Sequence, residues 1–222
     1  MELINEIKHE KRYIVAILDL LGASDRIEHG DSEGLLNVII YTFEHTKKHW
    51  MQVEHAPLTL RDIECVTFSD NIAIALELPE SLPGDEVMQR VNDFILYISV
   101  FQGAGLANCL WFRGGISIGK LYIDPKNNYI WGNALVKAHK LETKAIYPRV
   151  ILDSEVEKII FPEETRIKVD KDNRSFVDYI TTIRSLHSEW IDKNKEMIDR
   201  DKGSVDDKKV LDKFQWFLQQ ID

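Results

Sequence analysis

A continuous run of apolar and β-branched residues, Tyr13–Leu18 (YIVAIL), is the strongest structural constraint in this sequence. Six consecutive apolar residues without polar alternation are typical of a strand that is buried on both faces. Gly22 ends the strand, so Asp19 lies at its carboxyl end. A carboxylate beside a buried strand is costly to desolvate unless a partner or a metal ion neutralises it, although the same arrangement is ordinary at a water-exposed strand end. The chain therefore needs a sheet around this strand, with an acid at its end.

The remaining sequence supplies the other elements of an α+β sheet. Apolar spacing and turn residues predict a helix over 32–50, a hairpin over 62–78, a long amphipathic helix over 85–107, a strand pair broken by glycines over 110–123, a short strand over 129–131 and a helix over 133–146. A strand over 149–152, a short helix over 154–160 and a strand pair over 166–169 and 175–180 follow. The order β-α-β-β-α-β, then α-β, predicts a split βαβ sheet with helices on one face.

Length and composition suit one compact domain with appended material. With 222 residues and 44% hydrophobic content, the chain can bury a sizeable core, and a second full domain is not expected. We predict a catalytic domain over residues 1–183 and a helical extension over 184–222. Within the extension, a charged stretch at 199–207 separates two amphipathic helices.

Charge and targeting signals exclude several classes of function. A net charge of -9 opposes a general nucleic-acid binder, because phosphate backbones are bound by clustered Lys and Arg. The charged N-terminal stretch 1–12 lacks the apolar segment of a signal peptide, and no run of residues is long and apolar enough to span a membrane. Cys65 and Cys109 are expected to be reduced, buried thiols. We therefore expect a soluble, cytoplasmic protein without nucleic-acid or membrane partners.

A second acid is expected to join Asp19. Asp70 falls in the turn of the hairpin predicted to neighbour the first strand, so both carboxylates can project from one edge of the sheet. Two convergent acids repel each other and invite a cation, and hard oxygen ligands select magnesium or manganese. The alternative is that each Asp only caps a turn.

Four sequence blocks resemble the class III nucleotidyl cyclases, in the order of that family. ILDLLGASDRI resembles its first metal-binding strand, and TFSDNIAIAL resembles its second metal-binding hairpin. FRGGISIG resembles the Arg-x-Gly-Ile strand that follows, and YIWGNALVKAHKLE resembles the helix that closes the site. The blocks span about residues 13–149, and the ferredoxin-like sheet of that family matches the element order predicted above.

The departures from the family pattern concern the base and the transition state. Val66 stands where purine cyclases carry the Lys or Glu that selects the base, and Tyr129 stands where adenylyl cyclases carry an Asp. The transition-state Asn and Arg of the family fall on Val136 and Lys140. The segments RGGISIG, LETKAIYPR and VDKDNRSFVDYI resemble the bacterial pyrimidine cyclases of the Pycsar anti-phage system, which make cyclic UMP or cyclic CMP.

The resemblance implies a set of site residues and two divalent ions, Mn²⁺ or Mg²⁺. Asp19 and Asp70 would hold the ions with help from the carbonyl of Leu20, and amides around Leu21 to Ala23, those of Leu21 and Gly22 above all, would bind phosphate. Lys140 is expected to contact phosphate, although an exposed helical Lys is more often only solvated. The remaining substrate-binding candidates, each of which also has a purely structural interpretation, are Val66, Tyr129 and Arg113.

The resemblance also implies partners. We expect a homodimer with sites at the subunit interface that converts UTP to cyclic UMP, and a separate effector that reads the product. A cytidylate cyclase that takes CTP and a degenerate domain that senses a nucleotide without turnover stay open as alternatives. A protein-binding scaffold and a purine cyclase are weaker alternatives, the latter because neither purine pattern survives at Val66 and Tyr129.

Overall fold

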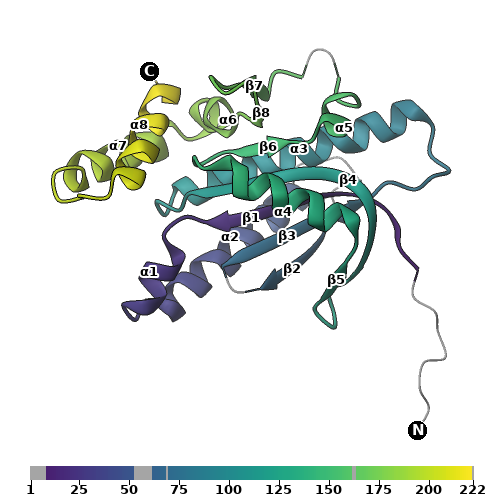
Figure 1. The fold of residues 1–222 in the computed structure, drawn as a ribbon, viewed down its shortest axis with the longest axis horizontal. Helices are drawn as coiled ribbons and strands as arrows, with labels where there is room; N and C mark the ends of the chain where they lie inside the picture. The colour runs from purple at the N-terminus through teal and green to yellow at the C-terminus, as the bar shows by residue number, and fades with distance from the viewer. Residues whose placement is uncertain (1–8, 53–61, 69, 162–163, 222) are drawn as a thin grey trace, which may run out of the picture.

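The structure is a computed structural model that describes residues 9–52, 62–68, 70–161 and 164–221. Its strands are β1 (Lys11–Leu20), β2 (Glu64–Phe68), β3 (Asn71–Glu77), β4 (Phe112–Asp124), β5 (Tyr129–Trp131), β6 (Val150–Leu152), β7 (Ile167–Val169) and β8 (Ser175–Val177). Its helices are α1 (Ala23–Glu28), α2 (Ser32–Gln52), α3 (Gly84–Leu106), α4 (Asn133–Ala145), α5 (Ser154–Glu157), α6 (Tyr179–Leu186), α7 (Ser188–Asp201) and α8 (Lys208–Ile221). The strands form a sheet in the order β2-β3-β1-β4-β6-β8-β7, and β5 pairs with β4 outside that path (Figure 1).

The predicted apolar strand, β1, lies inside the sheet and is covered on both faces. It pairs antiparallel with β3 on one side and with β4 on the other. Ile14 and Leu18 belong to a hydrophobic cluster with α2 and α3, whereas Val15 points to the opposite face and packs with Ala134 of α4. Figure 1 shows α4 in front of the sheet and α2 and α3 behind it. The prediction of helices on one face is therefore wrong, because a strand that is apolar on both faces needs a layer on each.

β4 is one continuous strand, so the prediction of a strand pair broken by glycines is also wrong. A Cβ atom on Gly115 would lie 2.3 Å from Cβ of Leu141 and 2.5 Å from the carbonyl oxygen of Ala138, both on α4. The glycine therefore serves close packing of α4 on the sheet and does not interrupt the strand.

Gly115→Ala is expected to lower the free energy of unfolding by about 1 to 3 kcal/mol, because the added methyl group forces α4 away from β4. Urea denaturation measures the change. Gly84→Ala is the matched control, since a Cβ atom there meets nothing within 4 Å and Ala favours the first turn of α3. Equal stability of the two variants would contradict the proposed packing role.

Most other predicted elements are confirmed. The hairpin joins β2 to β3, and the chain positions of the predicted helices over 32–50, 85–107 and 133–146 match α2, α3 and α4 within two residues. The short strand, the β7–β8 pair and the break between α7 and α8 are present as well. Neither Cys65 nor Cys109 is in a disulfide, and both are partly exposed, not fully buried. None of the helices in the described ranges has the length and hydrophobicity to cross a membrane.

The C-terminal helices pack against the rest of the chain. The predicted boundary between residues 183 and 184 lies inside α6. Phe217 of α8 and Ile191 of α7 share a hydrophobic cluster with Ile151 of β6 and Phe176 of β8. The separate extension over 184–222 stays a prediction, and its helices are joined to the sheet by this common core.

Candidate active site

Asp19 and Asp70 lie next to each other at one end of the sheet. In the β1–β3 register Asp19 is opposite Asn71, and Asp70 directly precedes Asn71. The amide of Leu20 donates a hydrogen bond to the carbonyl oxygen of Asp70 at 3.3 Å, which ties the hairpin turn to the end of β1. The side-chain amide of Asn71 donates to Oδ1 of Asp70 at 3.1 Å and so orients that carboxylate. The predicted convergence of the two acids follows from antiparallel pairing of adjacent strands.

Arg113 is the cation that contacts Asp19. The β1–β4 register places it directly opposite Asp19, and its Nε donates to Oδ2 of Asp19 at 2.7 Å. The Asp19 side chain is only 14% exposed, so this charged hydrogen bond offsets much of the cost of its burial. In the structure, Arg113 therefore pairs with a nearby acid, which is the structural interpretation of this residue.

Glu142 of α4 is a third carboxylate at this site, and the sequence argument did not single it out. Its Oε1 lies 2.9 Å from Nε of Arg113, yet it receives no hydrogen bond because the single hydrogen on that nitrogen points to Asp19. Burial raises the pKa of Glu142, the charge of Arg113 opposes the increase, and the charges of Asp19 and Asp70 add to it. The sequence feature that could have drawn attention to Glu142 is its position three residues after His139. That spacing puts both side chains on the same face of α4.

The turn after β1 is fixed by its backbone. The amide of Leu21 donates to the carbonyl oxygen of Trp111 at 2.9 Å, so it is not free to bind a phosphate as predicted. Gly22 has φ +79°, a left-handed conformation that favours glycine, and it is the N-cap residue of α1. Of the two predicted phosphate-binding residues in this turn, only Gly22 remains exposed with its amide outside the described hydrogen bonds.

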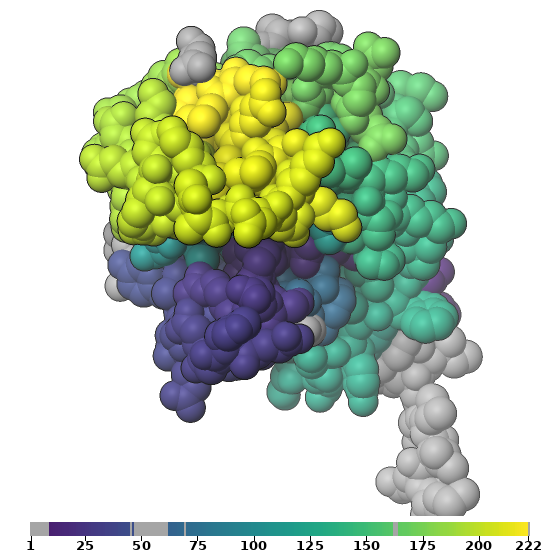
Figure 2. All heavy atoms as spheres, turned by 60° about the vertical axis from the view of Figure 1, so that its left-hand side comes forward, coloured from purple at the N-terminus to yellow at the C-terminus, as the bar shows by residue number. Residues whose placement is uncertain are grey.

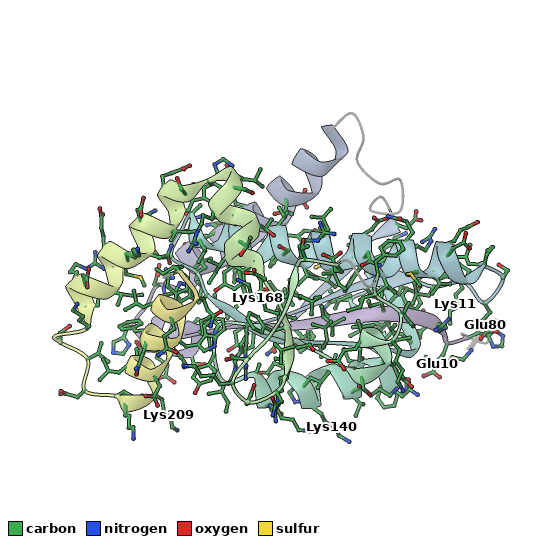
Figure 3. All side chains as sticks on the ribbon, turned by 90° about the horizontal axis from the view of Figure 1, so that it is seen from above. Glu10, Lys11, Glu80, Lys140, Lys168 and Lys209 are labelled. Carbon is green, nitrogen blue, oxygen red and sulfur yellow. The ribbon has the colours of Figure 1, made fainter. Side chains whose placement is uncertain are left out.

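Lys140 and Tyr129 lie apart from Asp19 in the same chain. Lys140 is two residues before Glu142 on α4, and residues with that spacing face different sides of a helix. Figure 3 shows Lys140 on the outer side of α4, directed away from the sheet. Tyr129 pairs with Asp124 at the far end of β4 from Arg113, and its side chain is 65% exposed. These two candidates therefore do not reach the carboxylates of their own chain.

Val66 lies on the same face of the sheet as Asp19, but very little of this residue is exposed to solvent. It is opposite Ala73 on β3, and its side chain is 3% exposed. A nucleotide base cannot contact it in this conformation, so the predicted base contact at Val66 is not realised in the single chain.

Comparison with solved structures identifies the fold of this chain. No protein-family model matches the sequence, and no curated protein matches it. Among solved structures, the guanylyl cyclase Cya2 superposes with a TM-score of 0.53 at 14% identity, covering 77% of this chain and 92% of that one. The chain has the fold of class III nucleotidyl cyclase catalytic domains.

Two further structures share this cyclase fold. The catalytic core of a rhodopsin-guanylyl cyclase with converted specificity, in complex with ATPαS, has a TM-score of 0.51 at 10% identity and covers 77% of this chain and 96% of that one. A class III adenylyl cyclase-like ATP-binding protein from Pseudomonas aeruginosa has a TM-score of 0.52 at 8% identity and covers 80% of this chain and 40% of that one. The predicted α+β fold class is confirmed.

The cyclase fold raises the question of whether this site suits a divalent ion. Within the part of the chain that the structure describes, no group of three or more His, Cys, Asp or Glu side chains forms a metal centre. Asp19 and Asp70 nevertheless lie on adjacent strands, and Oε1 of Glu142, which receives no hydrogen bond, lies 2.9 Å from the Arg113 Nε that contacts Asp19. Carboxylates of this kind suit Mg²⁺ or Mn²⁺, whose coordination shell is commonly completed by phosphate oxygens and water. The donor set therefore fits such an ion.

The side chain of Arg149, at the end of the LETKAIYPR segment, is part of a buried ion cluster. Its side chain is fully buried, bonds to Asp170, and donates from Nη2 to Oδ2 of Asp172 at 2.6 Å. Its Nε donates to the carbonyl oxygen of Ala145 at 3.1 Å, and Trp216 of α8 donates to Asp170 at 2.6 Å. The cluster therefore connects the end of α4 to the C-terminal helix and leaves Arg149 no access to a ligand.

The cluster predicts a pH dependence of stability. The hydrogen bond from Arg149 lowers the pKa of Asp172 from its ordinary 3.8, so the stability from this ionised group is present above pH 3.8 and is lost as the pH falls through the lowered pKa. Asp172→Asn is expected to make the decline of the unfolding free energy shallower in that acid range. Urea denaturation from about pH 6 to about pH 2 measures it. Parallel curves for the two proteins would contradict the assignment.

Proposed function

We propose that this chain is a metal-dependent nucleotidyl cyclase that prefers a pyrimidine substrate, with UTP converted to cyclic UMP and pyrophosphate. The observation that carries the proposal is the pair Asp19 and Asp70 on adjacent strands of a cyclase fold, with Arg113 fixing one of them. CTP, giving cyclic CMP, is the alternative substrate. The sequence resemblance to the Pycsar cyclases supports a role in anti-phage signalling through a separate effector of the cyclic nucleotide.

The proposed reaction joins the ribose 3′ oxygen to the α-phosphorus of the same nucleotide. The 3′ hydroxyl loses its proton, the new O–P bond forms, and the bond between the α-phosphorus and the bridging oxygen breaks with pyrophosphate leaving. Two divalent ions, when bound at Asp19 and Asp70, would neutralise the triphosphate and lower the pKa of the 3′ hydroxyl. Arg113 holds Oδ2 of Asp19 in place, and Asn71 does the same for Asp70. Both carboxylates are thus oriented before substrate arrives.

A homodimer is part of the proposal, because the chain divides its candidate residues between two surfaces. Tyr129 and Lys140 do not reach the carboxylates of their own subunit. The surface that carries them also exposes large apolar side chains on β5 and α4, with Trp131 75% exposed and Val136 53% exposed. Such side chains suit a subunit interface, where a partner's Tyr129 and Lys140 would face the metal-binding end. Sedimentation or light scattering gives the subunit mass, and a monomer at working concentration would contradict this part.

The cyclase assay tests the main proposal. Purified protein with Mn²⁺ is incubated separately with UTP, CTP, ATP and GTP, and cyclic product is identified by mass spectrometry alongside pyrophosphate release. Cyclic UMP from UTP is the expected result. A folded dimer that gives no cyclic product from any of the four would overturn it.

A second candidate is nucleotide binding without turnover. It is favoured by Val136 and Lys140, which replace the family's polar pair, and by the structural similarity to a class III adenylyl cyclase-like ATP-binding protein. Nucleotide binding measured by calorimetry, without pyrophosphate release, would support this candidate over the first.

A further inference from the structure

The C-terminal helix α8 lies beside the turn that follows β1. Leu21 and Gly22 of that turn line a cavity of about 200 Å³, together with Trp111 from the start of β4 and Lys213 and Phe214 from α8. Figure 2 shows α8, in yellow, above α1, in purple, with a recess between them. A segment nearly two hundred residues later in the sequence thus shares a cavity with the turn next to Asp19.

Aromatic contacts hold α8 in this position. The Trp111 ring stacks on Phe217 with centroids 4.9 Å apart, and Phe214 meets it edge-on at 5.6 Å. The indole nitrogen of Trp111 also donates to the buried side chain of Asn194 on α7 at 2.8 Å. Because Trp111 is next to β4, these contacts fix α8 relative to the strand that carries Arg113.

Lys213 brings a cation into this cavity. Partial burial and the nearby charge of Arg113 lower its pKa, while Asp207 and Asp19 oppose that decrease. Its ammonium group is therefore within electrostatic range of the charged groups at the end of β1. Among the residues that the structure describes, no carboxylate forms an ion pair with Lys213. A partly desolvated cation without an acidic partner is suited to an anionic ligand.

We propose that Lys213 binds the terminal phosphates of the nucleotide, so that α8 forms one wall of the nucleotide site. This inference rests on the proposed function, because it takes the triphosphate to lie over Asp19 and Asp70. The cavity extends from Gly22, three residues after Asp19, to Lys213 on α8, while Arg113 contacts Asp19 from β4. Lys213 is a binding residue in this proposal and takes no part in proton transfer.

Lys213→Met tests the role, because Met keeps an unbranched apolar side chain that packs beside Phe214 and removes only the charge. Calorimetry with Mn²⁺ and inorganic tripolyphosphate, and with UTP and UMP, measures binding by wild type and variant. We expect the affinity for tripolyphosphate and UTP to fall about tenfold, the affinity for UMP to stay unchanged, and Lys213→Arg to recover most of the loss.

Lys208→Met is the matched control on the same helix. Lys208 lines a different groove, between α8 and the turn at Asp170–Asp172, so its loss is expected to leave tripolyphosphate affinity unchanged. Equal tripolyphosphate and UTP affinities for wild type and Lys213→Met would overturn the inference, as would an equal loss in both Met variants. If Lys213→Met does not fold, wild-type affinity in Lys213→Gln would overturn it instead.

The two proposals fail in different ways. A wild-type protein that cyclises UTP, with a Lys213→Met variant of unchanged affinity, would overturn only the inference about α8. A wild-type protein that cyclises no nucleotide, yet binds tripolyphosphate in a manner that depends on Lys213, would overturn the proposed reaction and support the phosphate contact.

Discussion

Asp19→Ala is expected to reduce cyclic product formation by at least about 100-fold, because it removes a carboxylate proposed to bind both ions at the reacting phosphate. The measurement is the initial rate of cyclic UMP formation with Mn²⁺ and UTP. Nucleotide binding should weaken as well, since the triphosphate loses its ion bridge to the protein.

The structure of the site also predicts how Asp19→Ala affects stability. Arg113 loses its partner and keeps only the charge of Glu142 at 2.9 Å, so stability is not expected to collapse. Asp25→Ala on α1 is the control, because the Asp25 side chain is 81% exposed and lies outside the described carboxylate cluster. Full activity in Asp19→Ala, at wild-type stability, would show that the proposed metal site is in the wrong place.

Arg149→Met is expected to have the largest effect on stability. It leaves the carboxylate of Asp170 buried without its cation, and breaking a buried ion pair on one side costs about 3 to 5 kcal/mol. For a chain of this size that loss lowers the melting temperature by roughly 6 to 20 °C. Differential scanning calorimetry measures the change.

Arg200→Met provides the matched control for charge removal. Arg200 pairs with the neighbouring Asp201, and the two side chains are 73% and 37% exposed. Solvent screens exposed ion pairs and leaves them little net effect on stability, so this variant should melt close to wild type. Similar melting temperatures for the two Arg variants would contradict the structural role of the Arg149 cluster.

The Arg149 cluster and the proposed role of Lys213 depend on the same helix. Trp216 bonds to Asp170 on one side of α8, and Phe217 stacks on Trp111. Arg149→Met is therefore expected to loosen α8 at the cavity that Lys213 lines. A partial loss of tripolyphosphate affinity in that variant, measured below its melting temperature, would follow from this connection.

Local patterns in the sequence were sufficient to predict the central elements. The apolar run before Asp19 identified β1, the turn residues around Asp70 identified the hairpin, and helical spacing identified α3 and α4. Antiparallel pairing then placed Asp19 next to Asp70, because a hairpin beside β1 brings its turn to the end of that strand. These inferences succeeded because they depend on short-range chemistry and one strand pairing.

The glycines of β4 show where local reasoning failed. In the sequence, Gly115 cannot be told apart from a glycine that interrupts a strand. Only the position of α4 over it shows that the missing side chain permits close packing. The ion cluster around Arg149 could not be predicted for the same kind of reason. Its partners Asp170 and Asp172 are about twenty residues away, and nothing near Arg149 in the sequence identifies them as its partners.

The sequence by itself determined the central strand, the hairpin beside it and most of the order of elements, since each rests on the character of neighbouring residues. Asp19 and Asp70 stay proposed metal ligands. Only the tertiary structure decided that Glu142 and Arg113 share the site with Asp19, that Tyr129 and Lys140 lie elsewhere, and that α8 borders the cavity beside Gly22. Those arrangements depend on strand register and helix docking between distant segments, where buried contacts and charge pairing select one geometry among many that local sequence permits.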